Sequence, residues 1–507
     1  MQKIVILDFG SQFTQLIARV IREHKVYCEI YPCTAPFLED KSIVGVILSG
    51  GPASVLGADA PPFDLRWLQR DMPILGICYG MQLLSMCEGG VVESSQKREY
   101  GSSVITALGR HPLLEGVSPS TQVWMSHGDH VSLAPAGWTV LARSEHDVIA
   151  MMAKDKWSGV QFHPEVSHSI GGKEIIANFL FRICCIEPNW TMHNFMDSHI
   201  VALQEKIGDS HVICGLSGGV DSAVTAALLH RAIGTRLHCI FVDTGLMRLG
   251  EVAYIAEEFV DWDIRIVDAS TLFLEALEGV TDPEQKRKII GGLFIAVFEQ
   301  EAQRLQVEYG EIEFLAQGTL YPDVIESLSF RGPSVTIKSH HNVGGLPKNM
   351  KFRLVEPLRE LFKDEVRELG RELGLSAQRI GRHPFPGPGL AVRILGDITI
   401  DVVHILQQAD AIYMEELRNS GWYDKIWQAG AILLPIRSVG VMGDSRTYER
   451  VVALRAVHST DGMTANIVHL PWDVVERIST RIINEVRGVN RVVYDISNKP
   501  PATIEWE

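Results

Sequence analysis

The most informative stretch of the sequence reads Ser217-Gly218-Gly219-Val220-Asp221-Ser222. An apolar run ends just before it at Cys214, and a helix-like run from Ala223 to Ile233 follows. The stretch is therefore a glycine-rich turn between a strand and a helix, the unit of a parallel α/β sheet. Such a turn presents backbone N–H groups and the positive end of a helix dipole, which together hold phosphate oxygens. The spacing and the lysine of a Walker loop are both missing.

The region around this turn repeats the alternation of strands and helices. Leu237–Val242 and Ile264–Val267 are apolar runs of strand length, and Glu251–Val260 and Lys288–Leu305 have the pattern of helices. Strands that alternate with helices predict a parallel sheet with right-handed crossovers. Ligands of such a Rossmann-like domain collect at the carboxyl ends of its strands, where the turn at 217–222 lies.

The N-terminal region has an α/β pattern of its own. Ile4–Leu7, Val44–Leu48 and Ile74–Ile77 are short apolar runs closed by Gly, Ser or Asp, as in buried parallel strands. The alternation stops at Glu187–Trp190, where we place a domain boundary.

A second break is the cluster of prolines and glycines at His383–Gly389, which fits neither a helix interior nor a central strand. The residues after it mix helical runs (Val402–Ser420, Val474–Val486) with β-rich runs (Ala431–Ile436, Arg491–Ile496), as in a small α+β domain. The sequence therefore predicts three domains, at residues 1–187, 188–382 and 383–507.

Composition and charge exclude several classes of function. The chain has 507 residues, 46% of them hydrophobic and 21% charged, which is ordinary for a globular protein. Its net charge of −15 makes it a poor general binder of nucleic acid. No apolar run reaches the roughly 18 residues that span a bilayer, and the start at Met1–Asp8 is strand-like rather than a signal peptide. The eight cysteines form no C-x-x-C pair. We therefore expect a cytoplasmic protein with free thiols that binds neither nucleic acid nor membranes.

A candidate catalytic cysteine follows the strand Ile74–Ile77. In Gly76-Ile77-Cys78-Tyr79-Gly80 a strand ends, one reactive residue stands on a tight turn, and a helix begins. This is the pattern of a nucleophile elbow, in which flanking glycines allow close backbone approach. A thiol at a helix N-terminus has its thiolate favoured by the dipole.

A nucleophilic cysteine needs a base and a group that orients the base. His163 and Glu165 can supply both, because residues two apart in an extended chain point the same way. Gly50 and Gly51, which follow the strand Val44–Leu48, are candidate N–H donors of an oxyanion hole. Each piece alone is common in proteins, but together, in this order within one domain, they are specific.

The turn at 217–222 also carries side chains suited to a bound nucleotide. The hydroxyls of Ser217 and Ser222 can donate to phosphate oxygens, and Asp221 is the natural ligand for the Mg²⁺ that accompanies ATP. Lys338, in a polar loop further along, can neutralise phosphate charge as pyrophosphate leaves. The remaining members of the predicted ATP site contribute backbone: Gly218, Gly219 and Val220.

These two centres resemble two known families. The turn at 217–222 is similar to the pyrophosphate loop of the ATP pyrophosphatases, which adenylate a substrate oxygen and release pyrophosphate. Gly50-Gly51-Pro52, the Cys78 elbow and His163-Pro164-Glu165 resemble the class I glutamine amidotransferases. That resemblance implies a flavodoxin-like domain that hydrolyses glutamine through a γ-glutamyl thioester on the cysteine. It further implies two neighbours of the glutamine pocket: Tyr79 and Gln82.

Over its whole length the sequence is similar to the glutamine-hydrolysing GMP synthetases, and the tail Asp495–Glu507 is the most specific part. The resemblance implies a C-terminal dimerisation domain, a homodimer and ATP- and glutamine-dependent amination of xanthosine 5′-monophosphate (XMP) to GMP. The reaction passes through adenylyl-XMP, releases AMP, pyrophosphate and glutamate, and is the last step of de novo guanine nucleotide synthesis. The family pattern implies the following XMP contacts: Arg287, Gln408, Lys499 and Glu505.

Two other functions remain open on the sequence. A tRNA-modifying or NAD-forming amidator could use the same loop, but a tRNA enzyme should show a basic face and sulfur chemistry should show paired cysteines. A non-catalytic nucleotide sensor is the alternative from a different class. The sensor hypothesis is disfavoured because the residues predicted to carry catalysis and nucleotide binding are all present: Cys78, His163, Glu165, Ser217 and Asp221.

Overall fold

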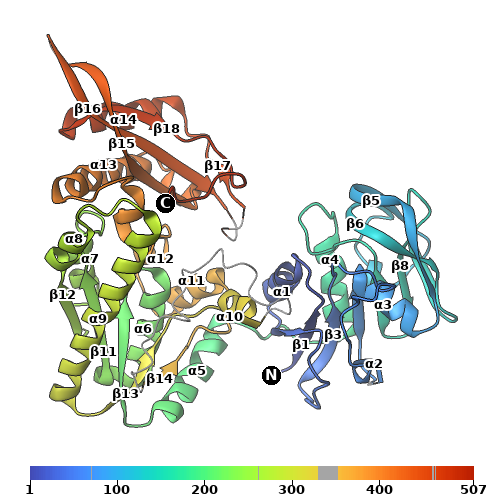
Figure 1. Ribbon diagram of the computed structural model, residues 1–507. Coiled ribbons are helices and arrows are strands. Elements are labelled where there is room, and N and C mark those ends of the chain that lie inside the picture. The colour runs from blue at the N-terminus through green and yellow to red at the C-terminus, as the bar shows by residue number, and fades with distance from the viewer. Residues whose placement is uncertain (70, 261, 329–351, 443, 460–461, 463) are drawn as a thin grey trace. The chain divides into compact units, whose positions relative to one another are not determined.

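The structure, a computed structural model, describes residues 1–507 except 70, 261, 329–351, 443, 460, 461 and 463, and it leaves out the side chains of 95–98, 326–328 and 442. The chain divides into two units (Figure 1). The first comprises Met1–Phe195 and the described part of Tyr321–Ile337, and the second comprises Met196–Leu320 and the described part of Lys338–Glu507.

A nine-stranded sheet of order β2-β1-β3-β4-β9-β8-β7-β5-β6 forms the centre of the first unit. Its first five strands are parallel and its remaining pairs are antiparallel. The parallel part has the flavodoxin-like strand order, as predicted. The strands are β1 (Lys3–Asp8), β2 (Cys28–Pro32), β3 (Ile43–Leu48), β4 (Ile74–Ile77), β5 (Val91–Ala107), β6 (Ser120–Leu133), β7 (Thr139–Ser144), β8 (Ile149–Lys154) and β9 (Trp157–Val160).

Short helices flank this sheet. The amphipathic α1 buries Ile17 and Ile21, so its apolar stripe covers the sheet, and its buried Arg22 donates to the carbonyl of Cys28 in β2 at 2.9 Å. The helices of the unit are α1 (Thr14–Glu23), α2 (Arg66–Gln69), α3 (Tyr79–Cys87), α4 (Gly172–Asn178) and α10 (Tyr321–Leu328), with short turns η1 (Pro112–Leu114) and η2 (Phe179–Ile183), and α5 (Met192–Ile207) leads into the second unit.

The second unit contains a fully parallel sheet of order β12-β11-β10-β13-β14. The chain adds β11 and β12 on one side of β10 and then β13 and β14 on the other. The carboxyl end of β10 is therefore the topological switch point, and the turn at 217–222 stands there. The elements are β10 (His211–Leu216), β11 (Leu237–Asp243), β12 (Ile264–Asp268), β13 (Ile312–Ala316), β14 (Arg353–Val355), α6 (Val220–Ile233), η3 (Gly234–Arg236), α7 (Glu251–Glu258), α8 (Ser270–Leu277), α9 (Pro283–Tyr309), α11 (Lys363–Glu372) and α12 (Ala377–Ile380).

The C-terminal part adds an α+β layer to the same unit. Two long antiparallel strands form a ribbon that runs out beyond the helices beside it (Figure 1), and β18 pairs with the inner half of β16 in parallel. The elements are η4 (Gly389–Arg393), α13 (Ile400–Asn419), η5 (Tyr423–Lys425), β15 (Gln428–Met442), β16 (Ser445–His458), β17 (Asn466–Ile467), α14 (Trp472–Glu485) and β18 (Val489–Tyr494).

The boundary predicted between residues 382 and 383 does not coincide with a division between the two units. One hydrophobic core joins Ile213 and Leu246 to Leu406 and Leu454, so apolar packing is continuous across it. The proline–glycine cluster takes part in this packing, because Phe385 packs against the core and a Cβ on Gly389 would collide with the carbonyl of Leu246. The segment His383–Gly389, which interrupts the pattern of helices and strands in the sequence, therefore lies within one continuous core.

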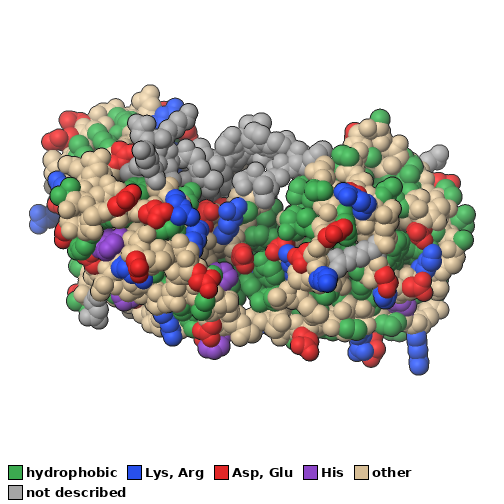
Figure 2. Space-filling model, turned by 90° about the horizontal axis from the view of Figure 1, so that it is seen from below, with side chains coloured by type: hydrophobic (Ala, Val, Ile, Leu, Met, Phe, Trp, Pro, Cys, Tyr) green, Lys and Arg blue, Asp and Glu red, His purple; other side chains and the backbone are tan. Residues whose placement is uncertain are grey.

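Two surface properties bear on partners. None of the helices in the described part of the chain is long and apolar enough to cross a membrane. On the face shown in Figure 2, Lys and Arg side chains lie among Asp and Glu side chains rather than in one continuous basic area.

Candidate active sites

Cys78 stands on a strained turn between β4 and α3. Its φ of 49° and ψ of −104° are unusual for a residue with a side chain, and its N–H donates to the carbonyl of Val160 at 2.7 Å. The flanking glycines are required: a Cβ on Gly76 would lie 2.6 Å from the backbone of Gly80, and a Cβ on Gly80 would collide with the carbonyl of Leu48. The elbow therefore forms because the helix can approach the strand closely.

His163 and Glu165 complete this site. Nδ1 of His163 lies 2.7 Å from Oε1 of Glu165, and both side chains are buried. A Cβ on Gly50 would lie 3.0 Å from Cε1 of His163 and 3.7 Å from Cβ of Cys78, so ring and thiol meet over this glycine. Burial alone would lower the pKa of His163, but the charge of Glu165 and the hydrogen bond with Cys78 outweigh it and raise that pKa to about 10.

The site has unused N–H donors on its backbone. Among the residues that the structure describes, the N–H groups of Gly50, Gly51 and Tyr79 have no hydrogen-bond acceptor. Donors of this kind can receive the charge of a tetrahedral intermediate.

Gln82, a predicted neighbour of the glutamine pocket, is linked by hydrogen bonds to residues around the elbow. Its Nε2 donates to the carbonyl of Asp129 at 2.7 Å and approaches Oε1 of Gln161 at 3.4 Å, while Nε2 of Gln161 approaches Sγ of Cys78 at 3.6 Å. Gln82 therefore ties β6 to the elbow through Gln161. The thiol also approaches this strand, at 3.7 Å from the carbonyl of Ser126.

The phosphate loop in the second unit has the geometry of an anion site. Gly218 has φ +77°, and Gly219 caps α6 without a side-chain hydrogen bond. Within the described residues the N–H groups of Gly218, Val220 and Asp221 have no acceptor. The loop shape is held by Ser222, whose Oγ donates to the carbonyl of Gly219 at 3.1 Å and accepts from the N–H of Ser217 at 3.2 Å.

Asp221, the predicted metal ligand, is held by a lysine that the sequence did not indicate. Nζ of Lys363, at the start of α11, lies 2.5 Å from Oδ1 and 2.6 Å from Oδ2 of Asp221. Gly318, two residues after the end of β13, also lies close to the loop, because a Cβ on it would be 3.3 Å from the carbonyl carbon of Asp221. Lys338 falls outside the described residues.

The C-terminal tail is folded into the second unit. The guanidinium of Arg393 donates to Glu505 through Nε at 2.9 Å and Nη2 at 2.8 Å, and Gln428 also bonds to that carboxylate.

The two predicted cations of the XMP site bond to backbone oxygens. Nη2 of Arg287 donates to the backbone oxygen of Glu507 at 2.5 Å. Nζ of Lys499 donates to the carbonyl of Gly462 at 2.7 Å. Arg287 and Glu505 are thus both fixed by contacts of the tail.

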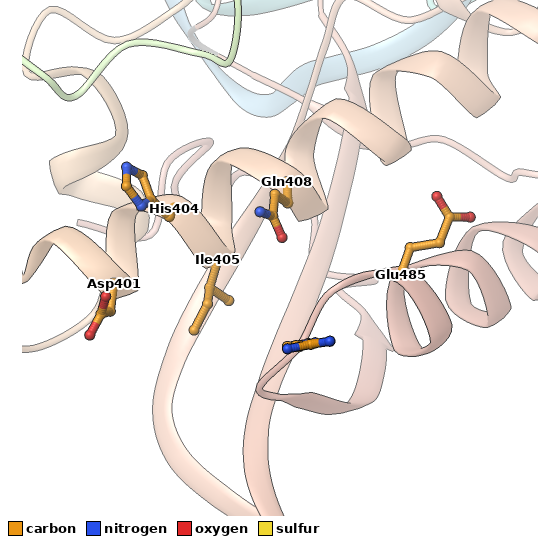
Figure 3. A pocket seen from close by; sticks show the side chains of 6 residues that line it. Asp401, His404, Ile405, Gln408 and Glu485 are labelled. Carbon is orange, nitrogen blue, oxygen red and sulfur yellow. The ribbon is translucent and has the colours of Figure 1, made fainter.

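Gln408, the fourth residue predicted to contact XMP, does not lie beside the tail residues named above. It lines a polar pocket of about 420 Å³ between α13 and the end of α14 (Figure 3). Neither Arg287, Lys499 nor Glu505 lines this pocket. The glutamine that the structure brings to Glu505 is Gln428. The other residues that line the pocket are Asp401, His404, Ile405, Glu485 and Arg487.

Three family models match successive parts of the chain. Residues 5–183 match "Glutamine amidotransferase class-I", residues 193–245 match "NAD synthase" and residues 415–506 match "GMP synthase C terminal domain". A crystal structure of a glutamine amidotransferase from Thermotoga maritima aligns with 41% of this chain and 86% of its own, at 20% identity and a TM-score of 0.29.

Curated relatives match the whole chain. A protein of Nitratidesulfovibrio vulgaris strain Miyazaki F named GMP synthase (glutamine-hydrolyzing) is 56% identical over 515 residues, which cover 100% of this chain and 99% of that protein. This chain belongs to the glutamine-hydrolysing GMP synthase family. A GMP synthase of Carboxydothermus hydrogenoformans is 54% identical over 512 residues, again with 100% and 99% coverage. The NAD synthase match runs from α5 to just past the end of β11 and includes the turn at 217–222.

The two sites also contain residues that the sequence motifs did not indicate. Gln161 could have been found, because it stands two residues before His163 on the same extended face. Lys363, Gln428 and Arg393 reach their sites only through long-range packing.

Proposed function

We propose that this chain makes GMP from XMP, with glutamine as nitrogen donor and ATP as activating substrate. The observation that carries the proposal is the presence, in one chain, of a buried Cys78–His163–Glu165 set and a phosphate loop with unused N–H donors. Whole-length relatives named GMP synthase (glutamine-hydrolyzing) support the same reaction. The structure provides one site for each half of it.

The first half-reaction is hydrolysis of glutamine at Cys78. The thiolate attacks the carboxamide carbon, and the N–H groups of Gly51 and Tyr79 receive the charge that develops on oxygen. The imidazolium of His163 gives its proton to the leaving nitrogen, and ammonia departs from a γ-glutamyl thioester. Water, deprotonated by His163, then releases glutamate. Glu165 keeps the ring in place and favours its protonated form.

The second half-reaction is activation of XMP at the phosphate loop. The N–H groups at the start of α6 hold the ATP phosphates while O2 of XMP attacks the α-phosphate and pyrophosphate leaves. Ammonia then displaces AMP from adenylyl-XMP and leaves GMP. The ring oxygen must be adenylated first because it is otherwise a poor leaving group.

The donor set of this loop fits Mg²⁺. In the described part of the chain no three His, Cys, Asp or Glu side chains form a metal cluster, and Mg²⁺ is commonly held by one or two carboxylates together with substrate phosphates. Asp221 offers such a carboxylate beside the loop, and Lys363 holds it in place. When bound, the ion would neutralise negative charge on the phosphates.

XMP is proposed to lie along the C-terminal tail. Arg287 and Lys499 are cations suited to a phosphate, and Glu505 is a carboxylate that can accept from ring N–H groups or ribose hydroxyls. Support comes from the tail being fixed rather than frayed: the guanidinium of Arg455, 4% exposed, donates to the carbonyls of Thr503 and Ile504 at 2.7 and 2.8 Å.

We also propose that a second copy of the chain covers the β15–β16 ribbon. Ile436, Val439, Val441 and Tyr448 on this ribbon are 51–74% exposed, and apolar side chains along an edge strand favour pairing with another chain. By light scattering we expect a dimer that Val441→Asp shifts toward monomer. The control Val307→Asp, at an 89% exposed position of α9, should leave the dimer intact. A monomeric parent protein would contradict the proposal.

The direct test of the function is incubation of the full chain with MgATP, glutamine and a panel of nucleotides. We expect AMP, pyrophosphate and an aminated product with XMP alone among the nucleotides. Amination of a different acceptor, or turnover without pyrophosphate, would overturn the assignment.

Two variants separate the half-reactions. Cys78→Ala should abolish glutamine-fed synthesis and keep synthesis from added ammonium, because only the first site loses its nucleophile. Asp221→Asn should lower pyrophosphate release by about tenfold or more, because a charge-assisted contact is lost, while glutaminase activity survives. Loss of both activities in Cys78→Ala would show that the sites are not separate.

A further inference from the structure

A buried charged cluster adjoins the phosphate loop and has no role in the two half-reactions as described. It consists of Glu251 at the start of α7, Arg379 in α12 and Arg382 just after α12. Arg379 is fully buried, Glu251 is 8% exposed and the side chain of Arg382 is 16% exposed. We call these three residues the loop bracket.

The loop bracket touches the loop at Gly218. Nη1 of Arg379 donates to the carbonyl of Gly218 at 3.2 Å. A Cβ on Gly218 would lie 2.8 Å from Oε1 of Glu251, and the other oxygen of Glu251 is paired with Arg382. The left-handed turn of the loop is therefore packed directly against this cluster.

The contact with Arg379 sets the direction of one peptide. In a trans peptide the carbonyl and the following N–H point opposite ways. The carbonyl of Gly218 points to the buried Arg379, and the N–H of Gly219 approaches Oγ of Ser217, an exposed residue, at 3.4 Å. If this peptide flipped, a carbonyl oxygen would replace an N–H at the mouth of an anion site.

The guanidinium groups of the loop bracket are only partly satisfied, although Glu258 of α7 adds a second carboxylate near Arg379. The loop bracket itself has two guanidinium groups and one carboxylate, and within the described residues Nε and Nη2 of Arg379 and Nη1 of Arg382 are buried without a hydrogen-bond partner. Burial, and then the neighbouring Arg382, lower the pKa of Arg379 to about 10. The rings of Phe259 and Tyr254, 4.8 and 5.3 Å from its guanidinium carbon, offset part of this cost. An anion bound in the loop would offset more of the cost of burying the Arg379 guanidinium.

We propose that Arg379, with the Arg382–Glu251 pair, is a positioning residue for the pyrophosphate end of ATP. It holds the Gly218–Gly219 peptide with its N–H outward and places a buried guanidinium, with Nε and Nη2 unpartnered among the described residues, next to the bound phosphates. The proposal rests on the proposed function of the loop. A residue that merely packed α12 against α7 would affect stability and leave the affinity for pyrophosphate unchanged.

The test is a calorimetric titration of the full-length protein with magnesium pyrophosphate, alongside the KM for ATP in ammonium-fed synthesis. Arg379→Met should weaken pyrophosphate binding and raise the KM for ATP, each by about tenfold or more, as for loss of a charge-assisted hydrogen bond. Arg379→Lys should fall between Arg379→Met and the parent protein. The control Arg371→Met, at an exposed arginine of α11, should change neither quantity.

The glutaminase rate and the melting temperature serve as internal references. Arg379→Met with a normal melting temperature and unchanged pyrophosphate affinity would overturn the proposal. Should Arg379→Met fail to fold, Arg379→Lys and Glu251→Gln carry the test, and unchanged affinity in both would overturn it equally. Pyrophosphate binding without XMP turnover in the parent protein would count against the proposed function while still allowing the role of Arg379 to be measured. An absence of pyrophosphate binding in the parent protein would refute that role.

Discussion

At the scale of single residues, the charge of Glu165 is the largest of the effects that raise the pKa of His163. Burial disfavours the charged ring, yet the carboxylate at 2.7 Å and the bond with Cys78 raise the pKa of His163 to about 10. Below that pH the imidazolium can protonate the departing nitrogen. Above it the proton is lost, so glutaminase kcat/KM should fall as the pH rises through about 10.

Glu165→Gln should move this alkaline limb to lower pH. The substitution keeps the size of the side chain and removes the charge that raises the pKa of His163. The measurement is the pH profile of glutaminase kcat/KM for variant and parent, with ammonium-fed synthesis as the reference that should not differ. An alkaline limb at the same pH in both proteins would mean that Glu165 does not control the ring.

At the scale of elements, both sites depend on a strand, a tight turn and a helix that approach each other closely. The turns at Cys78 and at Gly218 could be predicted because their glycines are local signals of such a turn. The switch point at the end of β10 depends on the order of the strands, which the alternation of strands and helices alone does not give.

Gly80→Ala tests the elbow at this scale. The new Cβ would lie 2.7 Å from Cβ of Leu48 and closer still to its carbonyl, so α3 must move away from β3. We expect a loss of about 1–3 kcal/mol of unfolding free energy and a strongly reduced glutaminase rate, measured by denaturant unfolding and glutamate release. Gly291→Ala is the matched control, because nothing lies within 4 Å of its Cβ in α9, and it should stabilise by roughly 0.5–1 kcal/mol. A stable, active Gly80→Ala protein would contradict the close packing.

At the scale of the whole molecule, the C-terminal tail closes the core of the second unit. Nζ of Lys286, which is fully buried, donates to a carboxylate oxygen of Glu507 at 2.6 Å, and the buried Arg393 is paired with Glu505. These partners lie 221 and 112 residues apart along the chain. The tail is therefore part of the fold, as well as the proposed edge of the XMP site.

Removal of Glu505–Glu507 should destabilise the second unit. It would leave Lys286 and Arg393 buried without their carboxylates, and breaking one buried pair costs about 3–5 kcal/mol. Thermal unfolding of the truncated chain should show a lower transition, while the glutaminase rate, set by the first unit, should change less. A truncated chain that melts like the parent would show that these pairs contribute no stability.

The local sequence was enough to predict the two chemical centres and the α/β layers. Glycine-flanked turns, short apolar strands and the His163–Glu165 spacing all act within a few residues, so their geometry is encoded where they stand. Residues that meet through packing could not be predicted in this way. Lys363 reaches Asp221 across 142 positions and Arg379 reaches Gly218 across 161.

The tertiary structure also decided the partners of the tail and the number of units. It placed Gln428 rather than Gln408 beside Glu505, and it joined the two C-terminal segments around one core. The physical reason is the same in each case. A turn is determined by the dihedral preferences of its own residues, whereas a buried charge pair or a shared core depends on which distant surfaces fit together, and a linear pattern of residues does not specify that fit.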